Sequence, residues 1–214
     1  MTAPATVSVY WSMQSAYCYF ALDRLLALEA RADVAVDLRP ARPGVLRQAG
    51  RYVEREAIER RYFDLDVRRT ADFLGLPFAE PNPSPVEFKP ETWQAAEHQP
   101  RIGWLYDLLL AATARGRGLA FLDKVMRLIW DGRTQGWDTG DHMEQALAAA
   151  DLDLGALKAE AETNREALMA DLHRNEADML ASGHWGVPLC IYRGEPFYGQ
   201  DRLDQRLWRL EAAT

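Results

Sequence analysis

The chain has 214 residues, of which 48% are apolar and 27% charged, so it can bury a sizeable core and is not a disordered chain. Its net charge of -7 argues against nucleic acid as the main partner, because phosphate contacts require a basic face. Two cysteines, Cys18 and Cys190, are too few for a disulfide framework, and neither they nor the four histidines have metal-ligand spacing. The N-terminus lacks the features of a signal peptide, and no run approaches the ~20 apolar residues that span a bilayer. We therefore expect a soluble cytoplasmic protein with no metal and no membrane partner.

The first forty residues predict a strand, a helix and a second strand. Residues 7–11 alternate between apolar and more polar side chains, which is typical of a half-buried strand. Ser15 can cap a helix that runs to about Ala30, along which apolar residues recur at helical spacing. Residues 33–40, "DVAVDLRP", alternate again and end at a proline. A helical crossover of this length predicts that the two strands are parallel.

The pattern of the middle of the chain is helical. A basic loop over 41–51 precedes a predicted helix from Glu54 to Leu74. Residues 75–90 contain five prolines and cannot be helical. Further helices are predicted over 91–114, 117–131, 139–150 and 154–182.

The end of the chain returns to strands. Residues 189–193 and 195–199 flank Gly194, which predicts an antiparallel hairpin, and a last helix begins near Asp201. The order βαβ followed by ββα is that of thioredoxin. We therefore predict an α/β, thioredoxin-like fold built from residues 1–40 and 181–214 and interrupted by an all-helical insertion, residues 41–180. In that fold Ser15 lies where the reactive group is found, and Pro188 lies where a cis-proline faces it.

Three segments together resemble the 2-hydroxychromene-2-carboxylate isomerase family, which are kappa-class glutathione transferase relatives with a DsbA-like fold. These segments are "VYWSMQSAYCYFAL", "RRYFDLDVRRTADFLGLPF" and "GHWGVPLCIYRGEPFYGQDRLD". The resemblance covers about residues 6–212. It implies a glutathione-dependent isomerase that converts a hemiketal aromatic acid into its open-chain benzylidenepyruvate, and it implies a homodimer.

The resemblance also implies the residues that hold glutathione. The Ser15 hydroxyl would donate to the glutathione sulfur and, with the helix N-terminus, favour the thiolate. The backbone of Val187, before the predicted cis-proline, would bind the cysteinyl part, and Asp201 would take the charged amino group of the γ-glutamyl end. The complete set predicted for the cofactor is Val187, Pro188, Gly199, Gln200 and Asp201.

A second set of residues is predicted to meet the aromatic carboxylate substrate, namely Arg47, Arg51, Tyr62 and Glu87. Arginines suit a carboxylate ligand because the guanidinium can bind it in a bidentate manner. Arg60 is either a surface or a pocket residue. Trp185 is, by position, the best candidate among the tryptophans for lining an aromatic pocket, and His184 is expected to be structural.

The segment "SAYC" has a serine where a dithiol enzyme has its attacking cysteine, so we predict that Cys18 packs in the core, as does Cys190. Three alternatives to the isomerase remain open. They are a kappa-like glutathione transferase, a DsbA-like thiol-disulfide oxidoreductase, and a non-catalytic binding member of the family. The last stays open because Ala16, Arg51 and Glu87 depart from the residues that the family has at these positions.

Overall fold

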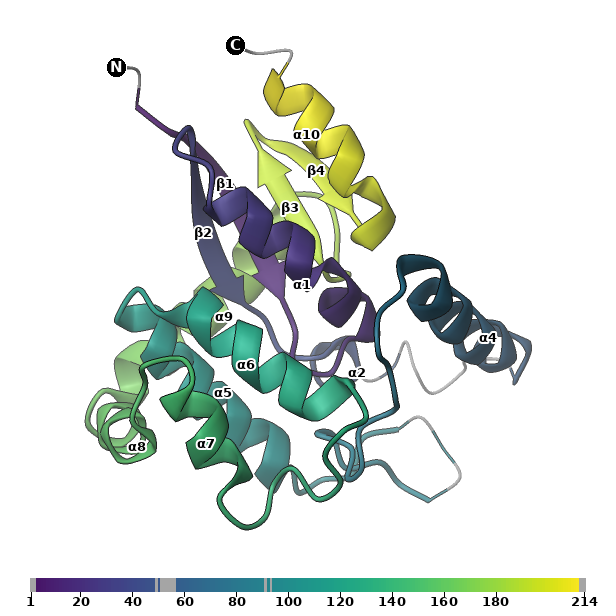
Figure 1. The fold of residues 1–214 in the computed structure, drawn as a ribbon, viewed down its shortest axis with the longest axis vertical. Helices are drawn as coiled ribbons and strands as arrows, with labels where there is room; N and C mark the ends of the chain where they lie inside the picture. Colours follow the sequence, from purple (N-terminus) through teal and green to yellow (C-terminus); the bar gives the residue numbers. More distant parts are fainter. Residues whose placement is uncertain (1–2, 49, 51–56, 91, 93, 212–214) are drawn as a thin grey trace.

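The computed structural model describes residues 3–48, 50, 57–90, 92 and 94–211. Its centre is a four-stranded sheet of order β2-β1-β3-β4 (Figure 1). The strands are β1 (Ala5–Trp11), β2 (Val34–Pro40), β3 (Leu189–Tyr192) and β4 (Glu195–Tyr198). β1 and β2 are parallel, whereas β3 is antiparallel to both of its neighbours. The predicted thioredoxin-like α/β fold, with its parallel pair and its hairpin, is confirmed.

Helices cover both faces of the sheet. On one face lie α1 (Ala16–Glu29) and α10 (Leu203–Glu211), and α9 (Arg165–Ala181) lies on the other (Figure 1). The alternation along β1 follows this division, because Val9 belongs to the main core with α1 whereas Tyr10 packs with Met179 of α9. The sheet is therefore buried on both sides. The end of β1 pairs with the start of β3, so the loops that follow β1 and precede β3 lie at the same end of the sheet.

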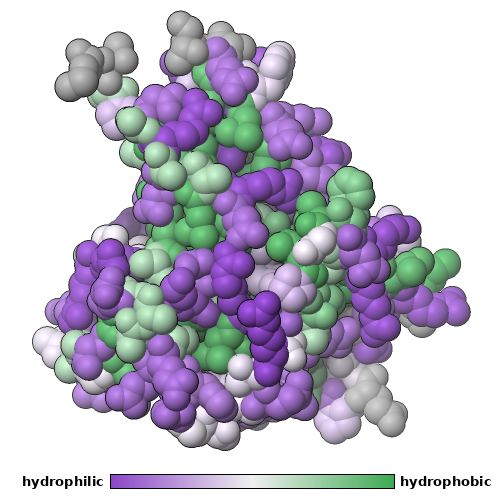
Figure 2. Space-filling view, in the orientation of Figure 1, coloured by the Kyte–Doolittle hydropathy of each residue, from purple (hydrophilic) through white to green (hydrophobic). Residues whose placement is uncertain are grey.

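The remaining helices form the segment between β2 and α9. They are α2 (Gly44–Arg47), α4 (Ala57–Leu74), α5 (Pro100–Ala114), α6 (Gly118–Trp130), α7 (His142–Ala148) and α8 (Leu154–Thr163). The main core runs continuously from α1 into α5 and α6, and the domain boundaries at 40/41 and 180/181 stay predictions. α4 stands at the outer edge (Figure 1), and Figure 2 shows apolar side chains exposed along it.

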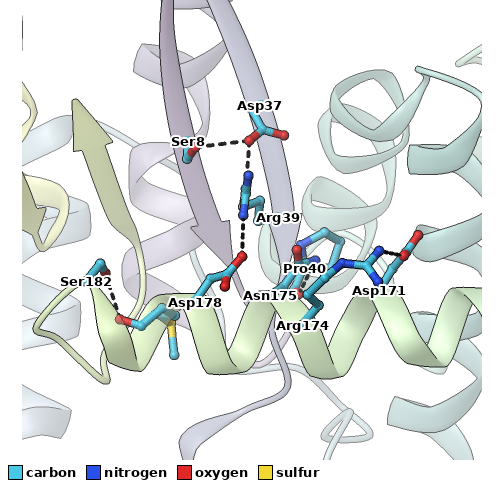
Figure 3. A network of polar contacts seen from close by, with 10 residues as sticks. Ser8, Asp37, Arg39, Pro40, Asp171, Arg174, Asn175, Asp178 and Ser182 are labelled. Atoms are coloured by element: carbon cyan, nitrogen blue, oxygen red, sulfur yellow. Dashed lines mark hydrogen bonds and ion pairs between the residues drawn. The ribbon is translucent and has the colours of Figure 1, made fainter. Parts of the chain in front are cut away.

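Polar contacts attach α9 to β2 (Figure 3). Arg39 bridges Asp37 on its own strand, at 2.7 Å, and Asp178 on α9, at 2.9 Å. The Ser8 hydroxyl donates to Asp37 at 3.0 Å, and the Asn175 amide donates to the Pro40 carbonyl at 3.2 Å. These contacts fix the helix across the strand that leads to α2.

Three predicted elements are corrected by the structure. The helix predicted over 91–114 begins only at Pro100, because a proline disfavours helical backbone at the residue before it and itself suits the first helical position. The helix predicted over 154–182 is two helices, which meet at Asn164, a residue with φ -109° and ψ 18°. The loop predicted over 41–51 contains the short helix α2. Among the described residues, no helix is long and apolar enough to cross a membrane.

Candidate functional site

Ser15 is the N-cap of α1. Its backbone is extended, with φ -102° and ψ 116°, and its hydroxyl oxygen accepts a hydrogen bond from the Cys18 amide at 3.2 Å. Accepting this bond leaves the hydroxyl hydrogen to be donated either to the Cys18 sulfur or to a ligand. The α1 dipole places partial positive charge at the same point. Ser15 lines the cavity described below, so a hydroxyl donor and a helix N-terminus face the same space.

Cys18 lies one turn further along α1 and is fully buried. Its sulfur accepts a hydrogen bond from the Ser12 amide at 3.5 Å. Burial raises the pKa of the Cys18 thiol to about 12, so it is a neutral thiol at physiological pH. Burial likewise raises the pKa of Cys190, which packs in the main core. The prediction that both cysteines are packing residues is confirmed.

A cis peptide bond joins Val187 and Pro188, as the fold order predicted. Val187 lines the cavity and precedes the sheet ladder, which begins at Leu189. Within the described part of the chain, neither its amide nor its carbonyl has a hydrogen-bond partner. An unpaired peptide group at a cavity wall is a site for the backbone of a peptide ligand.

A cavity of about 670 Å³ separates α1, α4 and the segment before Pro188. Its apolar wall includes aliphatic residues such as Val45 and Val67 and is mostly aromatic, formed by Tyr17, Phe63, Phe78, Phe88, Trp130, Trp185 and Tyr198. Three arginines and two acids share the lining, namely Arg47, Arg60, Asp64, Arg68 and Glu80. The combination of an aromatic wall and guanidinium groups suits a flat anionic ligand.

The ring of His184 supports the rim of this cavity. It stacks on Trp185 at 4.5 Å and on Tyr198 at 3.9 Å between ring centroids. Its Nδ1 atom accepts a hydrogen bond from the Gly186 amide at 2.9 Å. These contacts match the structural role expected for His184, and Trp185 lines the cavity as its position suggested.

Arg47 is the one residue predicted at the substrate that the structure places in the described lining of the cavity. Glu87 instead pairs with Arg101 of α5 at 2.6 Å, and Tyr62 is 61% exposed on α4. Both lie outside the lining. Arg51 lies outside the described residues, so its role stays a prediction.

The predicted γ-glutamyl site follows β4, next to the cavity rather than in its lining. Gly199 adopts φ +99° and donates its amide to the Pro188 carbonyl at 2.9 Å, which ties this segment to the cis-proline. The Gln200 side chain accepts a hydrogen bond from Arg24 of α1, and Asp201 pairs with Arg202. The roles of Gly199, Gln200 and Asp201 toward a cofactor stay predictions.

On α4, sequence reasoning named Tyr62 and left Arg60 open, but it missed Phe63, Asp64 and Arg68, which line the cavity. Arg60, Asp64 and Arg68 are spaced four residues apart, so they share one helix face, and that face lines the cavity beside Phe63. Tyr17 fixes the position of α4, because its hydroxyl donates to Asp66 at 2.6 Å. The i, i+4, i+8 spacing of the charged residues is the signal that was available.

A comparison with protein-family models identifies the family. The model of the DsbA-like thioredoxin domain matches residues 6–211. A search of curated proteins finds no match to the chain.

Solved structures share the fold at low identity. A 2-hydroxychromene-2-carboxylate isomerase is 17% identical, with a TM-score of 0.68 over 97% of this chain and 98% of that one. A probable DsbA oxidoreductase from Streptomyces coelicolor is 18% identical, with a TM-score of 0.65 over 98% and 89%. The cytosolic disulfide reductase DsbM from Pseudomonas aeruginosa, solved with GSH, is 18% identical, with a TM-score of 0.58 over 96% and 99%. With the match along nearly its whole length, the chain belongs to the DsbA-like thioredoxin family.

Proposed function

We propose that the protein is a glutathione-dependent isomerase of 2-hydroxychromene-2-carboxylate or a related conjugated aromatic acid. One observation carries this proposal. At the N-terminus of α1 a serine hydroxyl faces the cavity, while the nearby thiol of Cys18 is buried and neutral. A thiol reaction at this site therefore requires a thiol from outside the chain, which glutathione would supply.

The residues around the helix N-terminus fit glutathione. The unpaired amide and carbonyl of Val187 can bind the cysteinyl peptide group, as one strand binds another. This would direct the sulfur toward Ser15 and the positive end of α1. The γ-glutamyl end would then extend toward Gly199, Gln200 and Asp201, whose segment is bonded to Pro188.

The chemistry divides between the cofactor and the chain. Bound glutathione would supply a thiolate that adds to the conjugated double bond of the substrate, allows the resulting single bond to rotate, and leaves unchanged. Ser15 donates a hydrogen bond to the sulfur before addition and after departure, and the α1 dipole favours its negative charge. The aromatic wall of the cavity lowers the local dielectric and so strengthens both interactions.

The substrate we propose is an aromatic carboxylate. The rings of Tyr17, Phe63 and Trp130 offer stacking surfaces in the cavity. Arg60 and Arg68 project from α4 into the same space and can attract the carboxylate. Asp64 lies between them and Glu80 pairs with Arg68 at 4.0 Å, so these two acids limit the net positive charge and the charge complementarity is moderate.

A kappa-like transferase would use the same site and consume glutathione rather than return it. A DsbA-like oxidoreductase is the weaker alternative, because its dithiol chemistry needs an attacking thiol where this chain has Ser15. We further propose a homodimer in the cytoplasm, where reduced glutathione is abundant. Size-exclusion chromatography with light scattering measures the oligomeric state.

The proposed activity is tested by following benzylidenepyruvate absorbance with the purified protein, with and without glutathione. The proposal predicts turnover that requires glutathione and returns it quantitatively. Ser15→Ala should lose most of the activity, whereas Ser182→Ala, at the end of α9, should retain it. Stoichiometric consumption of glutathione would establish the transferase instead. Disulfide turnover that Ser15→Ala leaves undiminished would contradict the proposed site.

A further inference from the structure

A buried carboxylate in the helical segment is connected to the site by successive hydrogen bonds. Glu176 of α9 is 9% exposed. Its Oε1 atom accepts the Arg42 amide at 2.9 Å and the Arg42 Nε at 2.8 Å, and its Oε2 atom accepts an Arg42 terminal nitrogen at 2.6 Å. Glu176 therefore fixes both the side chain and the backbone of Arg42.

The backbone of Arg42 carries the contact onward. Its carbonyl accepts the Nε hydrogen of Arg47 at 2.6 Å. A terminal nitrogen of Arg47 then donates to the carbonyl of Trp185 at 2.8 Å. Arg47 thus spans from the β2–α2 loop to the segment that precedes Pro188, and two of its donors are occupied by backbone carbonyls.

The segment held by Arg47 is the one that receives the cofactor in the proposed function. Trp185 lies two residues before Val187, and both line the cavity. A shift of about 1 Å at such a peptide group is enough to weaken hydrogen bonds to a ligand, because their strength falls steeply with distance and angle. The position of Val187 therefore depends on a contact that begins on α9.

The charge of Glu176 matters for this connection. Burial by itself would raise the pKa of Glu176, but the hydrogen bonds and positive charge of Arg42 outweigh it and hold the pKa below its ordinary value. The carboxylate is therefore ionised at neutral pH. Asp178, two residues further along α9, makes an exposed ion pair with Arg39 that leads to β2 rather than to the site (Figure 3).

We propose that Glu176 is a positioning residue, which acts through Arg42 and Arg47 to hold the Trp185–Val187 backbone in the geometry that binds glutathione. Arg47 then orients the Trp185–Val187 segment and does not bind the substrate carboxylate. The part that concerns glutathione rests on the proposed function, whereas the effect on the backbone does not.

Hydrogen exchange of the unliganded protein tests the effect on the backbone. Glu176→Gln keeps the size of the side chain but removes its charge and one acceptor, and Asp178→Asn is the matched control on the same helix. We expect Glu176→Gln to speed exchange of the Gly186 amide, which donates to His184 Nδ1 at 2.9 Å, about tenfold and the control to leave it unchanged. Arg47→Ala tests the same connection from the site if Glu176→Gln does not fold. Exchange at Gly186 that neither Glu176→Gln nor Arg47→Ala alters would overturn the proposal.

Calorimetric titration of glutathione separates positioning from a merely structural role. Positioning predicts that Glu176→Gln raises the Kd about tenfold with the stoichiometry unchanged, because every folded molecule has a displaced site. A structural role would instead lower the stoichiometry and leave the Kd alone, which would contradict the proposal. If the wild type binds no glutathione, the proposed function fails, and the exchange measurement alone decides the role of Glu176.

Discussion

Ser15→Ala gives a quantitative test of the thiolate site. The substitution removes the one hydroxyl that caps α1 and faces the cavity. A hydrogen bond to a charged group contributes about 1.5–3 kcal/mol. Since one pKa unit corresponds to about 1.4 kcal/mol, the pKa of the bound glutathione thiol should rise by roughly 1–2 units. At a pH below that pKa, the thiolate fraction and the rate should fall about 10- to 100-fold.

The assay is the ultraviolet absorbance of the thiolate as a function of pH, with glutathione bound to each variant. Removing a donor to the anion destabilises the charged form, so the titration moves to higher pH and activity recovers as pH rises. Loss of an N-cap also costs about 1 kcal/mol of folding free energy, and that effect needs its own control.

Asp153→Ala is the matched control for the lost cap. Asp153 caps α8 by accepting the Ala156 amide at 2.6 Å, and it does not belong to the described lining of the cavity. It should reduce stability by a similar amount and leave the thiol pKa unchanged. If the thiol of bound glutathione has the same pKa in Ser15→Ala as in the wild type, with both proteins saturated, the role of the hydroxyl is refuted.

Four further outcomes are expected. The Cys18 thiol, with its pKa raised to about 12 by burial, should react with a colorimetric disulfide reagent at pH 8 only after unfolding, and rapid reaction of the native protein would contradict its burial. Ser15→Cys should form a disulfide with Cys18 under mild oxidation, and mass spectrometry showing two free thiols would oppose this. Gly199→Ala should lower the free energy of unfolding in urea by about 1–3 kcal/mol, because φ +99° is strained for alanine, whereas an unchanged midpoint would count against the strain. The Tyr17 hydroxyl lowers the pKa of Asp66 in the folded protein. Ionised Asp66 therefore stabilises the fold at pH values above its unfolded pKa near 3.9, and this stabilisation is lost as the pH falls through the lower pKa of the folded state. Tyr17→Phe should accordingly cost about 0.5–1.5 kcal/mol at neutral pH and reduce the acid dependence of stability, and identical curves would exclude this bond.

Local patterns were sufficient for the elements that build the sheet. The alternation of residues 7–11 and the cap at Ser15 depend on nearest neighbours, and both occur in the structure as predicted. The hairpin also follows from a local property, since Gly194 adopts φ +80° between β3 and β4. From the order of these elements alone, the cis bond at Pro188 was predicted and is confirmed.

Helix ends in the middle of the chain were less predictable. The apolar spacing continues through Asn164, with Leu157 and Ala161 before it and Leu168 after it all buried, so the pattern contains no break. The break lies in the backbone at Asn164, whose side chain donates to Glu160 at 2.7 Å. Because the break is confined to the backbone of this one residue, it leaves the apolar period of the side chains intact.

The lining of the cavity depends on tertiary packing that the sequence alone does not display. Tyr62 and Phe63 are neighbours on α4, yet Phe63 faces the cavity and Tyr62 faces outward. Adjacent residues on a helix point about 100° apart, so a small error in the rotation of α4 exchanges the two. That rotation is set by Tyr17 of α1, which bonds Asp66 and packs edge-on against Phe63 at 5.8 Å.

The most direct test of the account is calorimetric titration of glutathione into the wild-type protein. The proposed function predicts saturable binding at or below millimolar glutathione, weakened by Asp201→Ala and retained by Asp178→Asn. Heat changes no different from dilution at millimolar glutathione would contradict it, because the site would then have no thiol with which to perform the proposed reaction.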